Sequence, residues 1–198
     1  MTPEQGYAFT AFALVAAITP GPSNVMLTAT GAIAGVRGGL PCLLGVGAGM
    51  ALMMFAVAFG LGSLVLGHPM VVAALKWCGA AFLLWLSWKI ATAEAGNAAA
   101  DARPVGFLGA AAFQWLNPKA WLISTSAAVT YLEGDGTSAL TQALSMAGLF
   151  FAVAAPCSFV WLAFGVAMRR MLRSPRALRA LNIGMGALLA GSVVLIVW

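Results

Sequence analysis

Two proline motifs carry the polar groups of this chain that are best suited to bind a small molecule. The first consists of Pro20, Gly21, Pro22, Ser23 and Asn24, within an otherwise apolar stretch. Proline has no amide hydrogen and blocks the helical hydrogen-bond ladder, so this motif predicts a broken helix with freed backbone carbonyls. A helix that restarts after Pro22 directs its first amides, near Ser23 and Asn24, toward an anionic group. A kink that serves only packing is the alternative.

The second motif consists of Gln114, Asn117, Pro118 and Lys119, again within an apolar stretch. That stretch begins near Val105, so at about 1.5 Å per residue Lys119 lies about 18 Å along it. An ammonium at that depth in an apolar layer costs several kcal/mol unless it is paired or hydrated. Snorkelling of the side chain to a surface is the alternative. We expect Lys119 to line a binding site.

Groups able to do catalysis or bind metals are sparse. The single histidine, His68, lies in a short predicted loop, and no pair of acids falls within an apolar stretch. We therefore expect no enzyme activity, no metal and no cofactor. One other chemistry stays open: Cys42 and Cys157 each follow a proline and could pass electrons across a membrane as a thiol pair. Packing of buried cysteines as small apolar side chains is the simpler explanation.

The composition is that of an integral membrane protein. Of the 198 residues, 62% are hydrophobic and 8% are charged, and the mean hydropathy is +0.97. Soluble domains are about half apolar and about a quarter charged. Half of the ten Lys and Arg residues are arginines between positions 169 and 179, a cluster that indicates membrane topology. Water-soluble enzymes and nucleic-acid-binding proteins are excluded.

The apolar stretches predict six transmembrane helices of about 20 residues each. They run near Tyr7–Thr30, Leu40–Leu66, Met70–Trp88, Val105–Ala127, Leu140–Met168 and Leu178–Trp198. Three helices followed by three give the second half the opposite orientation, and prolines interrupt the first helix of each half. We predict an all-α integral membrane fold with one domain over residues 1–198, built from two inverted three-helix repeats near 1–92 and 104–198.

The distribution of Lys and Arg predicts the orientation of these helices. Arg37, Lys89, Arg103 and the five arginines lie in the first, third and fifth loops, whereas the N-terminus and the other two loops hold neither residue type. Cytoplasmic loops are enriched in Lys and Arg. Those three loops are therefore expected in the cytoplasm, and both termini on the outer side of the membrane.

Together these features resemble a known family. Thr-Pro-Gly-Pro at 19–22, Asn-Pro-Lys at 117–119, Lys-Trp-Cys-Gly-Ala-Ala-Phe-Leu at 76–83 and six spans in about 200 residues are similar to the LysE/RhtB family of amino-acid exporters. Within it, Trp-Lys-Ile-Ala-Thr at 88–92 and Ala-Val-Thr-Tyr-Leu at 128–132 look most similar to the cysteine/O-acetylserine exporter branch.

The resemblance implies efflux of small amino acids or their derivatives across a bacterial inner membrane, so the outer side predicted above for both termini is the periplasm. The expected partners are the amino-acid substrate and the lipid bilayer, with a proton as candidate coupling ion and a homodimer as candidate assembly. The broken helices suggest alternating access around a shared site. Lys119 and the amides near Ser23 and Asn24 would bind the substrate carboxylate, whereas carbonyls near Ala17 and Ile18, with Asn117 and Gln114, would accept the substrate ammonium.

All five acids lie in loops or at the N-terminus, so proton coupling would have to use Lys119, a loop acid or water. Two other functions stay open. The chain could be a thiol-redox membrane protein that uses Cys42 and Cys157, or a non-transporting subunit of a membrane complex. Replacement of the cysteines separates the first from a transporter, and substrate flux in liposomes separates the second.

Overall fold

The computed structural model describes residues 2–62, 67–92, 104–132, 138–171 and 174–197. This part of the chain is all helical, as the sequence predicts, and contains no strand. The elements in chain order are α1 (Pro3–Ile18), α2 (Pro22–Ala56), a π-helical segment η1 (Val57–Leu61), α4 (Pro69–Ala91), α6 (Phe107–Leu116), α7 (Pro118–Tyr131), α8 (Ala139–Met171) and α9 (Pro175–Val197). Arg103, Arg173 and Trp198, which entered the topology prediction, lie outside the described residues.

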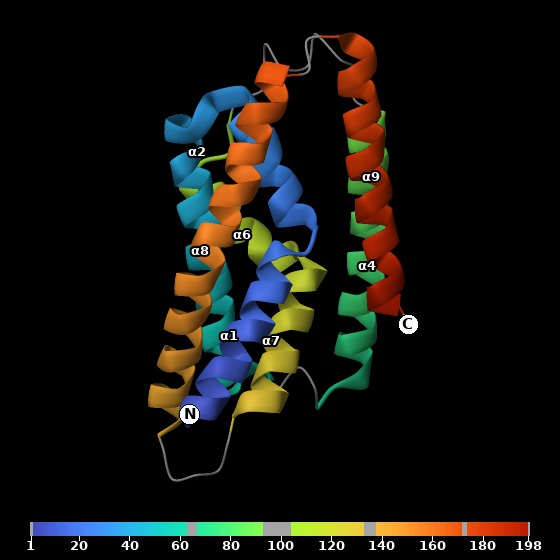
Figure 1. The fold of residues 1–198 in the computed structure, drawn as a ribbon. Helices are drawn as coiled ribbons and strands as arrows, with labels where there is room; N and C mark the ends of the chain where they lie inside the picture. Colours follow the sequence, from blue (N-terminus) through green and yellow to red (C-terminus); the bar gives the residue numbers. More distant parts are fainter. Residues whose placement is uncertain (1, 63–66, 93–103, 133–137, 172–173, 198) are drawn as a thin grey trace.

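The two proline motifs interrupt helices where the sequence predicts breaks. α1 ends at Ile18 and α2 begins at Pro22, so the first predicted helix is split in two. The fourth predicted helix is likewise split, because Asn117 separates α6 from α7 and caps α7. Both interruptions lie near the middle of the long axis of the molecule (Figure 1).

The predicted boundary between the first and second helices is a single glycine. Gly35 has φ 71° and ψ −175°, a conformation that side-chain-bearing residues rarely adopt. Helical geometry resumes directly after it, so α2 folds back on itself at this point instead of passing through the predicted loop at 35–39 (Figure 1). The remaining predicted helices correspond to α4, α8 and α9, with ends that differ by a few residues.

Small residues bring α2 close to its neighbours. A Cβ atom on Gly31 would collide with the Leu162 carbonyl of α8, and one on Gly165 would collide with the Thr28 carbonyl of α2. Helix pairs in membranes commonly associate through such glycine contacts. α2 and α8 therefore form the centre of the bundle, with α1, α6 and α7 packed around them (Figure 1).

Helices α4 and α9 form a pair at the side of this bundle (Figure 1). The Ser87 hydroxyl of α4 donates a hydrogen bond of 2.6 Å to the Gly186 carbonyl of α9. Leu83 and Leu189 are buried in the same apolar cluster, which also contains Val25 of α2. Val25 thus links the pair to the central helices.

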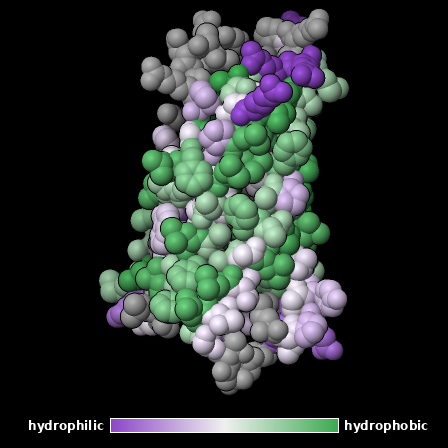
Figure 2. Space-filling model, turned by 90° about the vertical axis from the view of Figure 1, so that its left-hand side faces the viewer, coloured by the Kyte–Doolittle hydropathy of each residue, from purple (hydrophilic) through white to green (hydrophobic). Residues whose placement is uncertain are grey.

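The surface has the pattern of a protein that faces lipid. In the view of Figure 2 a broad apolar band separates two more hydrophilic ends. Large apolar side chains are exposed along several helices, among them Leu52, Trp85, Leu144 and Val160. In the described part of the chain, two helical stretches are long and apolar enough to cross a membrane, Pro22–Leu61 and Ala139–Met171.

The described arginines gather at one end of the molecule, where α2 folds back, α8 ends and α9 begins. Arg169 also has a structural contact there. Its Nη1 atom donates hydrogen bonds to the carbonyls of Ala32 and Ile33, at 2.8 and 2.7 Å. These carbonyls end the helical run before Gly35, so the guanidinium caps that run and ties it to α8.

Candidate functional site

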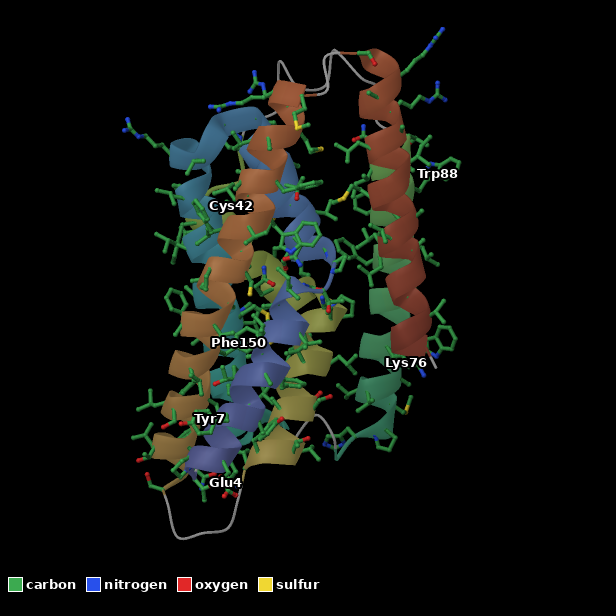
Figure 3. The ribbon with its side chains drawn as sticks, in the orientation of Figure 1. Glu4, Tyr7, Cys42, Lys76, Trp88 and Phe150 are labelled. Atoms are coloured by element: carbon green, nitrogen blue, oxygen red, sulfur yellow. The ribbon has the colours of Figure 1, made fainter. Side chains whose placement is uncertain are left out.

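A small cavity of about 40 Å³ lies where the two helix breaks meet. It is lined by residues of α1, α2, α7 and α8 and by the segments between them: Ala16, Ala17, Gly21, Ser23, Asn24, Val46, Met50, Asn117, Lys119, Ala120, Ile123, Phe150, Ala154 and Ser158. Phe150 marks its level in Figure 3, near the middle of the bundle. None of these described lining residues is acidic.

Lys119 spans the gap between the two breaks. Its Nζ atom donates hydrogen bonds to the Thr19 carbonyl at 2.6 Å and to the Pro20 carbonyl at 3.3 Å. The aliphatic stem passes directly over Gly21, where a Cβ atom would lie 2.8 Å from Lys119 Cδ and 3.2 Å from Nζ. Gly21 has an extended backbone that any residue can adopt, so the absence of a side chain there serves the close approach of the lysine.

Two other side chains also bind backbone carbonyls at the first break. Asn24 Nδ2 donates to the carbonyls of Ala17 and Thr19, at 3.1 and 2.8 Å. The indole nitrogen of Trp161, on α8, donates to the Ile18 carbonyl at 3.3 Å. Carbonyls that proline removes from the helical ladder are therefore bound by protein side chains, as a low-dielectric interior requires.

A chain of side-chain hydrogen bonds joins the two breaks. The Ser23 hydroxyl donates to Gln114 Oε1 at 2.8 Å, and Asn117 Nδ2 donates to Ser23 Oγ at 3.0 Å. Asn117 Oδ1 in turn accepts from the backbone amide of Lys119 at 3.1 Å and so caps α7. The two halves of the chain thus share one polar network in the middle of the bundle.

The N-terminus of α2 differs from that of α7. Gly21 occupies its cap position and supplies no side-chain hydrogen bond, whereas Asn117 caps α7. The first-turn amides of any helix lack intrahelical acceptors and form its positive end. At α2 this positive end lies at the cavity, because Gly21, Ser23 and Asn24 line it. With Lys119, it gives the cavity a positive character that suits a carboxylate.

All nine residues singled out from the sequence come together at the two breaks. Gly21, Ser23, Asn24, Asn117 and Lys119 line the cavity. Of the other four, Pro20 offers its carbonyl to Lys119, Pro22 and Pro118 begin helices, and Gln114 is fully buried in the polar network. The binding roles assigned to them stay predictions.

Sequence reasoning missed the contributions of α8 and of the second part of α2. Met50 and Ser158 line the cavity, and Trp161 binds the Ile18 carbonyl. Met50 and Ser158 carry no local signal, because their place depends on how distant helices pack. Trp161 carries a weak one, since a buried indole usually donates its N–H to an acceptor.

The residues the structure describes contain no group of three or more His, Cys, Asp or Glu side chains that could hold a metal ion. All three cysteines are free thiols, with Cys42 and Cys157 buried and Cys78 exposed. The Thr30 hydroxyl lies 3.7 Å from Cys42 Sγ, within hydrogen-bonding distance for sulfur. Cys42 lies above the level of the cavity in Figure 3, toward the end of the molecule where α8 ends.

Broken helices that meet at a polar cavity inside an apolar helical bundle characterise a membrane transport protein. Comparison with known proteins agrees and is more specific. Residues 14–197 match the family model described as LysE type translocator, and the chain belongs to the LysE family of membrane translocators, which are transporters and not enzymes.

Two relatives cover nearly the whole chain. The cysteine/O-acetylserine efflux protein of Salmonella typhimurium is 32% identical over 189 residues, which are 96% of this chain and 95% of that protein. The protein of the same name from Escherichia coli (strain K12) is 31% identical over the same extent. No solved structure matches the chain.

Proposed function

We propose that this protein exports small amino acids or their derivatives across a bacterial inner membrane, with cysteine and O-acetylserine as the first candidates. The observation that carries the proposal is the cavity at the two helix breaks, with Lys119 and the start of α2 in its wall. The relatives support the substrate class, because their names specify cysteine and O-acetylserine efflux and they align over 95% of their length.

The cavity contains groups for both charges of an amino acid. The Lys119 ammonium and the first amides of α2, near Ser23 and Asn24, bind the carboxylate. Backbone carbonyls of the first break bind the ammonium, with Asn117 and Gln114 as further acceptors. The apolar lining, which includes Met50, Phe150 and Ala154, suits a small uncharged side chain.

Transport proceeds by alternating access in a six-span protein of two inverted repeats. In this arrangement α1 with the first part of α2 forms the first span, and α6 with α7 forms the fourth. Their equivalent positions in the two halves, each broken near the middle, support the repeat. Rocking of the halves around the polar network exposes the site to each side in turn.

The proposed orientation of the protein in the membrane follows from the positions of the arginines. Five exposed arginines lie at the end of the molecule where α8 ends: Arg37, Arg169, Arg170, Arg176 and Arg179. Their position supports a cytoplasmic location for that end. Both termini then lie in the periplasm. A proton remains the candidate coupling ion and a homodimer the candidate assembly. Since no described acid lines the cavity, coupling would use Lys119, a loop acid or water.

Counterflow of labelled amino acids in proteoliposomes, across a panel that includes cysteine and O-acetylserine, tests the transport function. Lys119→Met keeps the length of the side chain and removes the ammonium. A hydrogen bond to a charged group contributes about 1.5–3 kcal/mol, so flux of the preferred substrate should fall roughly tenfold or more. Lys119→Arg should retain only part of it, because the guanidinium has a different shape.

Lys76→Met is the matched control. Lys76 is also on a membrane helix, α4, but lies away from the cavity (Figure 3), so its replacement should leave counterflow unchanged. Flux at the wild-type level in Lys119→Met, with unchanged apparent affinity at equal abundance, would assign Lys119 a structural role and require another binding site. Absence of counterflow for every substrate in the wild-type protein would instead favour a non-transporting subunit.

A further inference from the structure

We infer that Lys119 occupies the ammonium site of the substrate when the transporter is empty, and that substrate binding exchanges one ammonium for the other. This inference rests on the proposed function and deepens it. It makes Lys119 the residue that selects amino acids, which carry both charges, over simple amines and simple acids.

The first argument is the chemistry of the contact. Lys119 Nζ donates to the carbonyls of Thr19 and Pro20, at 2.6 and 3.3 Å. An α-ammonium group has the same charge and the same three donors as a lysine ammonium. The carbonyl pair that holds the lysine is therefore also a suitable acceptor for the ammonium of an amino acid.

The second argument is the lack of a competing acceptor. The described lining residues include no carboxylate, so a substrate ammonium depends on carbonyl or amide oxygens. The oxygens of Ala17 and Ile18 accept from Asn24 and Trp161, and Gln114 Oε1 accepts from Ser23. The Thr19 and Pro20 carbonyls differ from these because they accept from Lys119, a donor on a long, flexible stem, although the Thr19 carbonyl also accepts from Asn24.

The third argument is space. A cavity of about 40 Å³ holds a few water molecules, because one buried water needs about 10–15 Å³. An amino acid is larger, so its binding must displace part of the wall. The Lys119 stem lies over Gly21 at the edge of the cavity, and it can rotate away without disturbing a helix.

These arguments lead to an exchange in which no charge is left unpaired. The incoming carboxylate offers Lys119 an oppositely charged partner in place of neutral carbonyls, and the lysine swings toward it. The substrate ammonium then takes the place of Lys119 at the carbonyls of Thr19 and Pro20, and Asn24 keeps its hydrogen bond to the Thr19 carbonyl. An amine without a carboxylate would displace the Lys119 ammonium from its carbonyls and offer it no new partner. An acid without an ammonium would draw Lys119 away and leave the carbonyls without a donor in its place. A buried polar group that loses its partner weakens binding.

Three thiols that differ only in their charged groups test this inference. They are cysteine, cysteamine, which lacks the carboxylate, and 3-mercaptopropionate, which lacks the ammonium. Each competes with labelled cysteine for the purified protein in detergent, under a reductant, so that leakage of the amine across liposomes does not matter. The wild-type protein should bind cysteine at least tenfold better than either analogue.

Lys119→Met should change the affinities for cysteine and for cysteamine in opposite directions. Cysteine should bind roughly tenfold more weakly, because its carboxylate loses a charged partner. Cysteamine should bind more tightly, by up to about tenfold, because no lysine competes for the carbonyls. Lys119→Ala, which also removes the stem, serves as a second variant, and Lys76→Met should leave all three affinities unchanged.

The outcomes separate the inference from the proposed function. Weaker cysteine binding without tighter cysteamine binding, in both Lys119 variants, would overturn the exchange but keep Lys119 as the carboxylate ligand. Unchanged cysteine binding would overturn both. If the panel identifies a different amino acid as substrate, its own decarboxylated and deaminated analogues replace the thiols, and the same reversal is expected.

Discussion

At the scale of single residues, Lys119 is a partly buried cation whose partners are uncharged. Membrane proteins commonly pair such a charge with a carboxylate or with backbone carbonyls, and here the partners are the neutral carbonyls of Thr19 and Pro20. A carboxylate partner would neutralise the lysine and leave little attraction for a substrate. With carbonyl partners the positive charge stays in the cavity, where an anionic group can still use it.

Substitution of Gly21 tests whether the position of Lys119 matters, because it moves the lysine without changing its charge. In Gly21→Ala the new Cβ would lie 2.8 Å from Lys119 Cδ, so the stem has to move and Nζ has to lengthen its bond to the Thr19 carbonyl. The backbone is extended and accepts alanine, so the fold should persist. We expect counterflow to fall roughly tenfold, equivalent to the loss of about one charged hydrogen bond.

Gly6→Ala is the control for this substitution, because a Cβ at Gly6 meets no atom within 4 Å. Its counterflow and its melting temperature in detergent should both match the wild type. Undiminished transport by Gly21→Ala would mean that Lys119 can leave the carbonyls without consequence, and would argue against its assigned place in substrate binding.

At the scale of elements, proline chemistry explains why the breaks could be predicted. Pro20, Pro22 and Pro118 each remove a helical hydrogen bond and so favour a break, and α1, α2, α6 and α7 end or begin at these motifs. Proline alone does not decide the outcome, because Pro41 and Pro156 lie inside α2 and α8. The fold-back at Gly35 was less predictable. Glycines also lie at positions 31, 38 and 39, and no local rule indicates that Gly35 is the one of them that takes the positive φ.

The partners of the site were predictable only in part, for the same reason. Lys119 and Asn24 could be predicted because a charged or amide side chain within an apolar stretch indicates a functional or structural polar contact. The indole of Trp161 reaches the Ile18 carbonyl from a position 143 residues away, and Arg169 reaches Ala32 across 137 residues. Such contacts depend on the tertiary arrangement of α2 and α8, which periodicity and composition do not specify.

Two glycines of α8 test this arrangement. Gly165→Ala would push a methyl group into the Thr28 carbonyl, and overpacking of this kind costs about 1–3 kcal/mol. Gly148→Ala, on the same helix, meets no atom within 4 Å and should leave stability unchanged or slightly improved, since alanine favours helices. Thermal unfolding in detergent should show a lower melting temperature for Gly165→Ala alone. Equal melting temperatures would contradict the close packing of α2 against α8.

At the scale of the whole molecule, packed contacts lie between the cavity and each end of the bundle. Toward the arginine-bearing end, Gly31, Gly165 and Arg169 hold the first part of α2 against α8. Toward the opposite end lies an apolar cluster that includes Phe9 and Met146. In the proposed alternating-access cycle, opening of one of these contacts at a time would release the substrate to one side of the membrane.

The orientation of the molecule decides which of these contacts faces the cytoplasm, and single cysteines can report it. On a background in which Cys42, Cys78 and Cys157 are alanine, Arg37→Cys and Arg176→Cys should be protected in intact cells from a membrane-impermeant maleimide and should react after permeabilisation. Lys and Arg mark cytoplasmic ends, and both side chains are exposed at the end of the molecule where α8 ends.

Glu4→Cys and Ser138→Cys are the complementary reporters. Both residues are exposed, at the start of α1 and just before α8, and Figure 3 places Glu4 at the end opposite to that of the arginines. They should react with the maleimide in intact cells, without permeabilisation. One proposed span separates Glu4 from Arg37, and four separate Glu4 from Ser138. A six-span inverted repeat therefore requires labelling of both Glu4→Cys and Ser138→Cys together with protection of Arg37→Cys. Labelling of Arg37→Cys from outside would reverse the orientation, and with it the assignment of the contact at Arg169 to the cytoplasmic side of the transport path.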